Sequence, residues 1–510
     1  VFEGQQQATW KGLAFTAACS SGTDDRHEMS YVDFKNTSDA AIVAGSRHGN
    51  SPSSNANVGN FTMDHVTFTN VGTAFKHGSG QGTILTMSDF EINDASDACF
   101  DLAEDSVVTL RDGEMNDCNS NGNSWGGAVI NYPGSTAGAL VMENIDIDDS
   151  MVNLVDVDFA TVWMSNVTAT TTSAQVGTVL GAAGAGTGSS TYIFNMDADG
   201  YADATINSLD SVELRDVDWG SADVSIVPGG SSSTAAGPSG DNAVISNFES
   251  DDLTMTRIAP TMDDITIGQL SILGNSPSNI GILGSNWDTD GISVSGCGYK
   301  VVIDTVTTDY VAGSCSNSAA PNTIMLSDVT ATYTGTMNAL YARNSGITIG
   351  EGSVTMPSSY DKMAKASTNG RIILIDVNQI DSSGTSSDCE SASDCDVSSS
   401  SSGAIYFGGL ATVKVYKLLP SGKDYKEGHT VQATAVDAGS PMFMVGTHKT
   451  DANGEASVWV LTANDAGDTY SDHNLVAFGP SGQNETMVTD SWYPGSFEVG
   501  DTIELRLEPA

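Results

Sequence analysis

The sequence predicts an all-β protein, in which a solenoid of repeated short strands is followed by a small β-sandwich. Three observations lead to this prediction. A phrase of alternating apolar residues returns about a dozen times, and successive copies often lie 22 to 25 residues apart. Each phrase holds an Asp or Asn where the alternation slips by one residue. Beyond residue 404, longer alternating segments replace the repeat.

The phrase predicts a strand, a one-residue corner and a second strand. In "TILTMSDFEI", Leu85, Met87, Phe90 and Ile92 alternate except for one extra residue between Met87 and Phe90. A single strand cannot keep both apolar pairs on one face across that slip, so the chain must bend there. Asp and Asn are the non-glycine residues that best tolerate the left-handed backbone of such a bend.

The same corner is expected in every copy, which would align the corner residues as a ladder of acid and amide side chains. The expected corner residues are Asp64, Asp89, Asp112, Asn144, Asn166, Asn195, Asp216, Asn247, Asp264, Asp304, Asp328 and Asp376. Carboxylates on neighbouring strands, about 4.8 Å apart, repel each other and favour a bound cation.

Calcium is the cation we expect, because it prefers carboxylate oxygens. The residues expected to bind calcium are Asp146, Asp148, Asp149, Asp263, Asp288 and Asp290. The alternative is that these acids face salt water without a bound metal ion.

The repeat resembles the right-handed parallel β-helices of the pectate-lyase-like superfamily over residues 25–380. The resemblance depends on the repeated phrase, on its period and on a second echo, "SDAAI", "GTAF" and "SDACF", which predicts the next strand of successive coils. It implies a β-helix fold. The catalytic motifs of that superfamily, an Asp cluster with Gly-His-Gly or Arg and Lys with calcium, have no recognisable counterpart here. A leucine-rich repeat and a left-handed hexapeptide helix do not fit the pattern.

The segments outside the repeat have separate expected roles. Residues 1–24 are expected to cap one end or to link subunits, and residues 381–403 to form a Ser- and Cys-rich linker. Residues 404–510 alternate as seven or so strands, with a hairpin turn expected at Asn453-Gly454. Through "TDANGEA" they resemble the Ig-like carboxypeptidase-regulatory or Cna-B modules of microbial surface proteins.

Seven cysteines favour disulfides over free thiols or a metal site. The spacings suggest the pairs Cys99 with Cys118, Cys297 with Cys315, and Cys389 with Cys395. Disulfides imply an oxidising, extracellular setting. Cys19 is left over and could remain a thiol or bond to another chain. Sequons for glycosylation occur at Asn36, Asn60, Asn166 and Asn484.

The charge balance limits the partners. Asp and Glu number 64 against 19 Lys and Arg, a formal net charge of −45, which repels nucleic acid and other polyanions. No apolar run reaches the ~18 residues that membrane insertion needs. The first residue is Val1 and no leader follows it, so we expect a mature or trimmed chain. No residue is assigned as catalytic, although scarce basic groups gather at residues 26–28, 47–49 and 76–78.

These observations predict a non-catalytic extracellular or cell-surface structural protein, a subunit of a filament, sheath or surface layer, or a stalk. A solenoid has two ends to cover, and head-to-tail contacts between ends generate open fibres. The expected partners are copies of the chain itself, and also cell-surface glycans. The alternatives are a polysaccharide-active lyase or hydrolase, with the basic groups lining its cleft, and a glycan-binding adhesin or tail-spike.

Overall fold

The computed structural model is all-β. The residues that it describes contain strands and turns but no helix, and so none that could cross a membrane. The described residues are 2–3, 10–15, 26–44, 60–77, 83–102, 106–118, 128–132, 138–148, 153–157, 161–171, 180–181, 190–208, 210–228, 237–276, 281–316, 320–335, 338–358, 360–435, 443–470, 473–478, 488–492, 500 and 502–507. The chain divides into two compact units, Val1–Gly284 and Ser285–Ala510.

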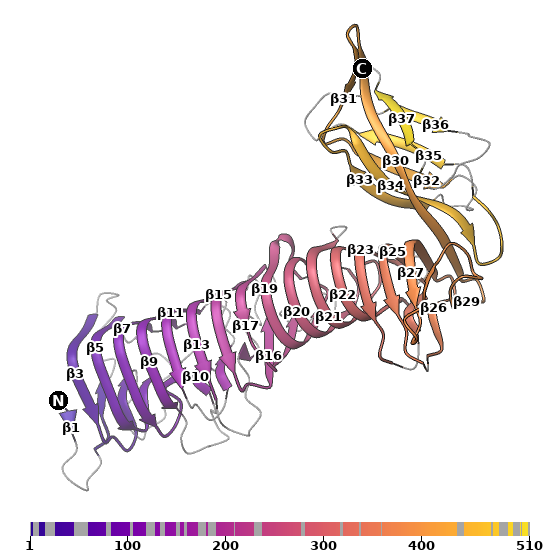
Figure 1. The fold of residues 1–510 in the computed structure, drawn as a ribbon. Coiled ribbons are helices and arrows are strands. Elements are labelled where there is room, and N and C mark those ends of the chain that lie inside the picture. The colour runs from indigo at the N-terminus through magenta and orange to yellow at the C-terminus, as the bar shows by residue number, and fades with distance from the viewer. Residues whose placement is uncertain are drawn as a thin grey trace. The chain divides into compact units, whose positions relative to one another are not determined.

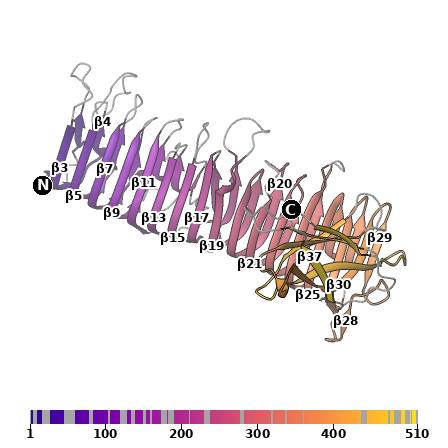
Figure 2. The same cartoon turned by 90° about the horizontal axis from the view of Figure 1, so that it is seen from above.

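In the first unit, most strands pair in parallel with the strand one repeat further along the chain (Figure 1). A first row contains β3 (Arg26–Lys35), β5 (Asn60–Val71), β7 (Ile84–Ala95), β9 (Val107–Cys118), β11 (Ala139–Asp148), β13 (Thr161–Thr170), β15 (Ser190–Asp199), β17 (Ser211–Asp218), β19 (Ser239–Thr256) and β20 (Ala259–Leu273). Figure 2 shows β3 to β19 in this order from above. The two-residue β1 (Phe2–Glu3) pairs in parallel with the end of β3.

A second row of the first unit is formed by the short strand that follows each phrase. Its seven-stranded parallel sheet contains β2 (Leu13–Phe15), β4 (Ala40–Ala44), β6 (Thr73–His77), β8 (Phe100–Asp101), β10 (Ala128–Tyr132), β12 (Asn153–Val157) and β14 (Leu180–Gly181). Further along, β16 (Asp203–Asn207) pairs with β18 (Asp223–Val227), which pairs with the second half of β19. A strand of the first row and the short strand that follows it in the second row together form one repeat, which we call a rung.

The register explains the repeated phrase. Phe61, Leu85 and Val108 are partners on successive strands, and all are buried. Beyond the corner, the rings of Phe34 and Phe68 stack with centroids 5.1 Å apart. The inward side chains thus form a continuous apolar core between neighbouring rungs, while the alternate residues face outward. Long stacks of parallel strands of this kind are compatible with a β-helix-like solenoid.

The second unit also contains parallel rows. One row runs through β22 (Lys300–Ser314), β23 (Asn322–Thr332), β25 (Ser345–Thr355), β27 (Arg371–Ile380) and the start of β30 (Ala404–Leu419). Another runs from the end of β22 through β24 (Asn338–Arg343) and β26 (Lys362–Ser367) to β29 (Val397–Ser400). The chain enters this unit within β21 (Ile282–Val294).

Residues 381–403, which we expected to form a linker, are attached to these rows. Within this stretch, β28 (Ser386–Asp388) pairs antiparallel with β27, and β29 pairs in parallel with β26. The disulfide between Cys389 and Cys395 closes the segment between the two strands.

The C-terminal residues form two sheets around one apolar core. The long β30 pairs with β31 (Gly422–Tyr425), β34 (Glu455–Asn464) and β37 (Thr502–Leu507). An antiparallel sheet contains β33 (Phe443–Lys449), β32 (Thr430–Ala435), β35 (His473–Phe478) and β36 (Val488–Trp492). Val413 and Val458 of the first sheet pack in one cluster with Val431 of the second.

The turn at Asn453-Gly454 differs from the hairpin that we expected. It joins β33 to β34, which pair in different sheets. The oxygen Oδ1 of Asp451 accepts hydrogen bonds from the backbone N–H groups of Asn453 (2.8 Å) and Glu455 (2.9 Å). Gly454 has a φ of 73°. The Asp451 side chain therefore closes a tight turn that carries the chain from one sheet to the other.

Candidate functional site

The expected corners are left-handed at ten of twelve positions. Their φ angles lie between 46° and 55°, a region that Asp and Asn tolerate best after glycine. These ten residues are Asp89, Asp112, Asn144, Asn166, Asn195, Asp216, Asn247, Asp264, Asp328 and Asp376. In the first unit, the register places eight of them, Asp89 to Asp264, opposite one another from strand to strand.

Asp64 and Asp304 were wrongly placed at corners. The left-handed residues are their successors, His65 (φ 53°) and Thr305 (φ 63°). Each Asp instead lies at the last strand position before the corner and accepts a hydrogen bond from the serine on the next strand. Ser88 Oγ donates to Asp64 Oδ1 (2.9 Å), and Ser327 Oγ donates to Asp304 Oδ1 (2.8 Å). The two exceptions thus share one local arrangement.

Three further corners lie outside the twelve positions predicted from the sequence. Tyr31, Asn286 and Glu351 all have a φ between 54° and 57°. The ring of Tyr31 lies against the ring of His65, with centroids 4.5 Å apart. The tyrosine at this corner is therefore in ring contact with the next corner.

Amide side chains connect neighbouring corners in the first unit. Asn144 Nδ2 donates to Asp112 Oδ1 (2.7 Å), and Asn166 Nδ2 donates to Asn144 Oδ1 (2.8 Å). Asn195 Nδ2 continues the series to Asn166 Oδ1 (2.7 Å). Asn can donate to one rung and accept from another, whereas an ionised Asp can only accept. We call the series from Asp112 to Asn195 the amide ladder.

A groove of about 500 Å³ lies beside the beginning of this ladder, and we call it the acidic groove. Its charged wall contains Asp89, Glu91, Asp112, Glu114 and Asp146, and Phe90 and Gly113 lie among them. Glu91, Glu114 and Asp146 are partners on successive strands, which brings like charges side by side. Such a row attracts cations and repels anionic ligands.

His65 stands at one end of the acidic groove between two carboxylates. Its Nδ1 lies 2.8 Å from Asp64 Oδ2, and its Nε2 lies 2.8 Å from Asp89 Oδ2. The hydrogen bonds from His65 and Ser88 lower the pKa of Asp64. His65 is itself a corner residue, so its imidazole links its own corner to the Asp89 corner of the next strand.

The residues expected to bind calcium do not converge in the described part of the chain. Asp146 and Asp148 are exposed on β11, where Asp148 accepts a hydrogen bond from Thr170 Oγ1. Asp263 precedes the corner on β20, and Asp288 and Asp290 are exposed on β21. Asp149 lies outside the described residues. Among the residues described, no group of three or more His, Cys, Asp or Glu could hold a metal ion. Calcium stays a prediction.

The three expected disulfides are present: Cys99 with Cys118, Cys297 with Cys315, and Cys389 with Cys395. They are compatible with an extracellular protein. Cys19 lies outside the described residues.

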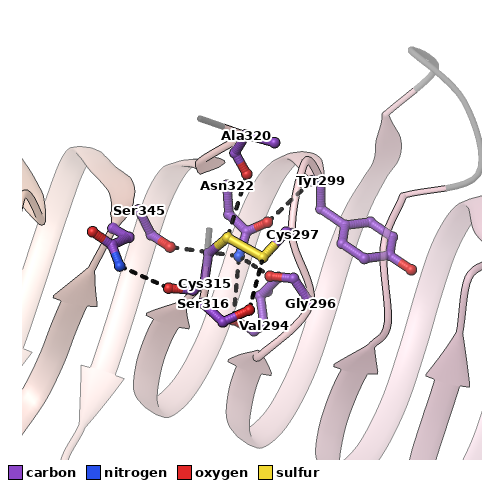
Figure 3. Close-up of a disulfide and its surroundings, with 10 residues drawn as sticks. Val294, Gly296, Cys297, Tyr299, Cys315, Ser316, Ala320, Asn322 and Ser345 are labelled. Carbon is purple, nitrogen blue, oxygen red and sulfur yellow. Dashed lines mark hydrogen bonds between the residues drawn. A yellow bond between two sulfur atoms is a disulfide. The ribbon is translucent and has the colours of Figure 1, made fainter. Parts of the chain in front are cut away.

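Figure 3 shows the second disulfide beside the buried Asn322. The Asn322 side chain donates to the carbonyl of Gly296 (2.6 Å) and accepts from the backbone N–H of Tyr299 (3.0 Å). This amide and the disulfide fix the connection that leads into β22.

Among the described residues, the basic groups at 26–28 and 76–78 do not come together in one site. The ring of His27 packs between the rings of Phe15 and Phe61, with centroids 4.8 and 4.6 Å away. Lys76 forms an ion pair with Asp101 (2.9 Å). His77 is buried, neither ring nitrogen has a described partner, and burial lowers its pKa to about 4. Residues 47–49 lie outside the described part.

The sequons lie in different environments. Asn36 accepts a hydrogen bond from Asn70 Nδ2 (2.8 Å), Asn60 begins β5, and Asn166 belongs to the amide ladder. Asn484 lies outside the described residues. Glycosylation of Asn166 would replace one of the two hydrogens on the nitrogen that donates to Asn144.

Comparison with known proteins gives no match to this chain, whether with protein-family models, with curated proteins or with solved structures.

Proposed function

We propose that the protein is an extracellular structural protein, a subunit of a filament, sheath or surface layer, or a cell-surface stalk. In this proposal residues 25–380 form a right-handed parallel β-helix, and residues 404–510 form an Ig-like module. Copies of the chain associate head to tail. The protein is non-catalytic, calcium neutralises its outer acidic rows, and cell-surface glycans are further partners.

The observation that carries the proposal is the incompletely covered first rung. Among the described residues, the outer edge of β3 pairs with β1 alone. This pairing involves only Phe34 and Lys35 of β3. The inward-facing Met29 and Val32 of β3 are half-buried, whereas their partners on β5 are 0% and 1% exposed. A strand edge with unpaired backbone groups beside a partly exposed core is a surface for another strand.

The last rung of the second unit is covered in a different way. The rings of Trp459 and Tyr470 and the side chain of Leu461 pack with Ile373 and Ile375 of β27 in one cluster. In addition, β34 pairs with the start of β30. The C-terminal sheets therefore protect this edge, which supports assembly through the other edge. Because the last rung is covered, the proposed head-to-tail contact places the open edge of β3 against a different surface of the next copy, which is a heterologous contact.

Electron microscopy of the purified protein, with and without calcium, tests the proposal. We expect linear or sheet-like assemblies with a fixed repeat. The variant Met29→Glu/Val32→Glu places two carboxylates on the exposed end of the core and is expected to abolish assembly. Ile84→Glu/Val107→Glu adds the same two carboxylates at exposed positions of β7 and β9, away from the first rung, and this matched control is expected to assemble normally.

Dispersed particles at all protein concentrations would contradict the proposal, as would assemblies that are indifferent to the two glutamates. Melting curves of both variants show whether the fold is retained. Release of new reducing ends from a polysaccharide would favour a polysaccharide-active enzyme instead.

A further inference from the structure

A second groove, of about 550 Å³, lies in the second unit, and we call it the tyrosine groove. Its lining consists of Tyr310, Ala312, Tyr333, Asn338, Tyr341, Lys365 and Ser367. The volume lies within the range of roughly 300–1,000 Å³ that is typical of small-molecule sites.

The register holds the outward side chains of the tyrosine groove in line. Ala312, Tyr341 and Lys365 are partners on β22, β24 and β26, and Ser367 lies two residues beyond Lys365. Ala312 leaves one side of the Tyr341 ring free of a bulky neighbour in this row. The Tyr341 hydroxyl lies 3.1 Å from Ser367 Oγ. Tyr341 thus presents its ring with the hydroxyl oriented by a neighbouring strand.

A glycine allows the Tyr310 ring to lie close to the backbone. A Cβ atom at Gly291 would lie 2.2 Å from the Tyr310 ring. A ring seated on a glycine keeps a fixed place, so the groove has preformed aromatic surfaces. Preformed aromatic surfaces bind flat apolar faces without a large loss of side-chain entropy.

One lining residue of the tyrosine groove, Asn338, carries a hydrogen-bond acceptor without a donor in the described part of the chain. Asn338 Oδ1 is buried and has no hydrogen-bond partner among the described residues. An unsatisfied buried acceptor costs about 1–3 kcal/mol, and native structures contain few of them. A ligand that brings a hydroxyl or N–H donor into the groove would satisfy it.

The chemistry of the lining narrows the class of ligand. Sugar rings combine an apolar C–H face, which stacks on tyrosine, with hydroxyl groups that donate to Asn338 Oδ1 and accept from Ser367. A quaternary ammonium ion also binds to aromatic rings, but it has no O–H or N–H donor for Asn338 Oδ1. The Lys365 ammonium group is already paired with Asp361 (3.0 Å), which disfavours an acidic ligand.

We propose that the tyrosine groove binds a neutral oligosaccharide, with the rings of Tyr310 and Tyr341 stacking on sugar faces and Asn338 Oδ1 accepting from a sugar hydroxyl. The site is a binding site and includes no catalytic step. It is independent of the assembly proposed above, because none of its residues lies on the first rung.

The probes are hexasaccharides of β-1,4-glucose, β-1,3-glucose, α-1,4-glucose, β-1,4-mannose and β-1,4-xylose, together with tetramethylammonium as the competing cation. Saturation-transfer NMR detects contact, and calorimetry gives the Kd. We expect at least one hexasaccharide to bind. Tyr341→Ala should weaken its binding by about tenfold or more, because a stacked aromatic surface is lost.

Asn338→Leu separates a ligand acceptor from a structural amide. We expect about tenfold weaker binding together with an unchanged or higher Tm, because leucine removes an unpaired buried acceptor. Trp163→Ala is the control for sugar stacking elsewhere, since Trp163 is 38% exposed and packs on Tyr192 and Phe194 in the first unit. We expect it to leave the Kd unchanged.

Four outcomes would overturn the assignment. These are no binding by any of the five hexasaccharides, binding that survives both groove substitutions in folded protein, loss of binding in Trp163→Ala alone, or binding of tetramethylammonium that displaces the sugar. These binding measurements can be interpreted even if electron microscopy shows no assembly, because none of the groove residues lies on the first rung.

Discussion

The acidic groove of the first unit and the tyrosine groove of the second are built on the same kind of backbone. In both, parallel strands align outward side chains from rung to rung, and a glycine makes room for a ring of another rung. A Cβ atom at Gly113 would lie 2.3 Å from the Phe90 ring, and one at Gly291 would lie 2.2 Å from the Tyr310 ring. The outward side chains alone distinguish a carboxylate-lined groove from a groove with aromatic walls.

The repeat therefore specifies two properties separately, which are the register of the strands and the chemistry of the outer surface. Inward residues such as Leu85 and Ile324 are interchangeable apolar groups that set the register. Outward residues are free of that requirement, so neighbouring rungs can accumulate charge in one place and aromatic rings in another. Substitutions that act on inward, corner and outward positions therefore test the comparison at different levels.

Acidification should produce the largest loss of stability, and it should act on both units. Burial lowers the pKa of His77 in the first unit and of His448 in the second to about 4. Both are neutral in the folded state at pH 6.5 and gain protons more readily when unfolded. The stabilisation that each neutral histidine contributes is therefore complete above pH 6.5. As the pH falls from 6.5 towards 4, each histidine lowers the free energy of unfolding by at most about 3 kcal/mol.

Urea unfolding at pH 7.5, 6, 5 and 4 measures this effect. The Asp101 charge partly opposes the effect of burial on the pKa of His77, whereas burial alone lowers the pKa of His448. His77→Phe should remove the part of the pH dependence of unfolding that comes from the first unit. His448→Phe should remove the part that comes from the second unit. A pH dependence unchanged in both variants would contradict the prediction.

Gly113→Ala should cost the first unit about 1–3 kcal/mol, because the new methyl group overlaps the buried Phe90 ring. Phe90→Leu removes the ring that occupies this space, so the double variant should recover most of the loss. A double-mutant cycle followed by thermal unfolding measures the coupling between the two positions. Additive losses would show that Phe90 does not occupy the space left by Gly113.

The positions of the corners were largely predictable from the sequence, and the exceptions show which signal matters. Asp64 and Asp304 are followed by His65 and Thr305, so the phrase contains two polar residues between its apolar pairs. The left-handed residue is the second of the two, directly before the next apolar residue. This position, and not the presence of Asp or Asn, identifies the corner, and it predicts Tyr31 as well.

The grooves were not predictable in the same way. Most of their charged residues and the rings of Tyr310 and Tyr341 face outward, and alternation with buried neighbours says nothing about which side chains on different rungs meet. Tyr310, Tyr341 and Lys365 come together because the loops between rungs set the register, and loop lengths vary along the chain. Disulfides were easier to predict, because local spacing limited the choice of partners.

Asn166→Asp should cost about 1 kcal/mol, because the new carboxylate cannot donate to Asn144 Oδ1 and meets its oxygen at close range. Added calcium or sodium chloride should recover part of this loss by screening the charge. The matched control is Asp376→Asn, at a left-handed corner of the second unit, which exchanges the same two groups in the opposite direction. Thermal unfolding should show the control to be neutral or slightly stabilised. Equal losses for both variants would contradict a role for the amide ladder.

Gly291→Ala should have the smallest effect on stability and the clearest effect on the tyrosine groove. Tyr310 is half-buried, in contrast to Phe90, so its ring can turn towards solvent when a methyl group takes its place. We expect a loss below about 1 kcal/mol, because a ring that moves into water avoids the overlap that Phe90 must accept. Calorimetry with the hexasaccharide that binds best should nevertheless show weaker binding, since one aromatic wall is displaced. A loss of stability as large as that of Gly113→Ala would mean that Tyr310 belongs to the core and not to a ligand site.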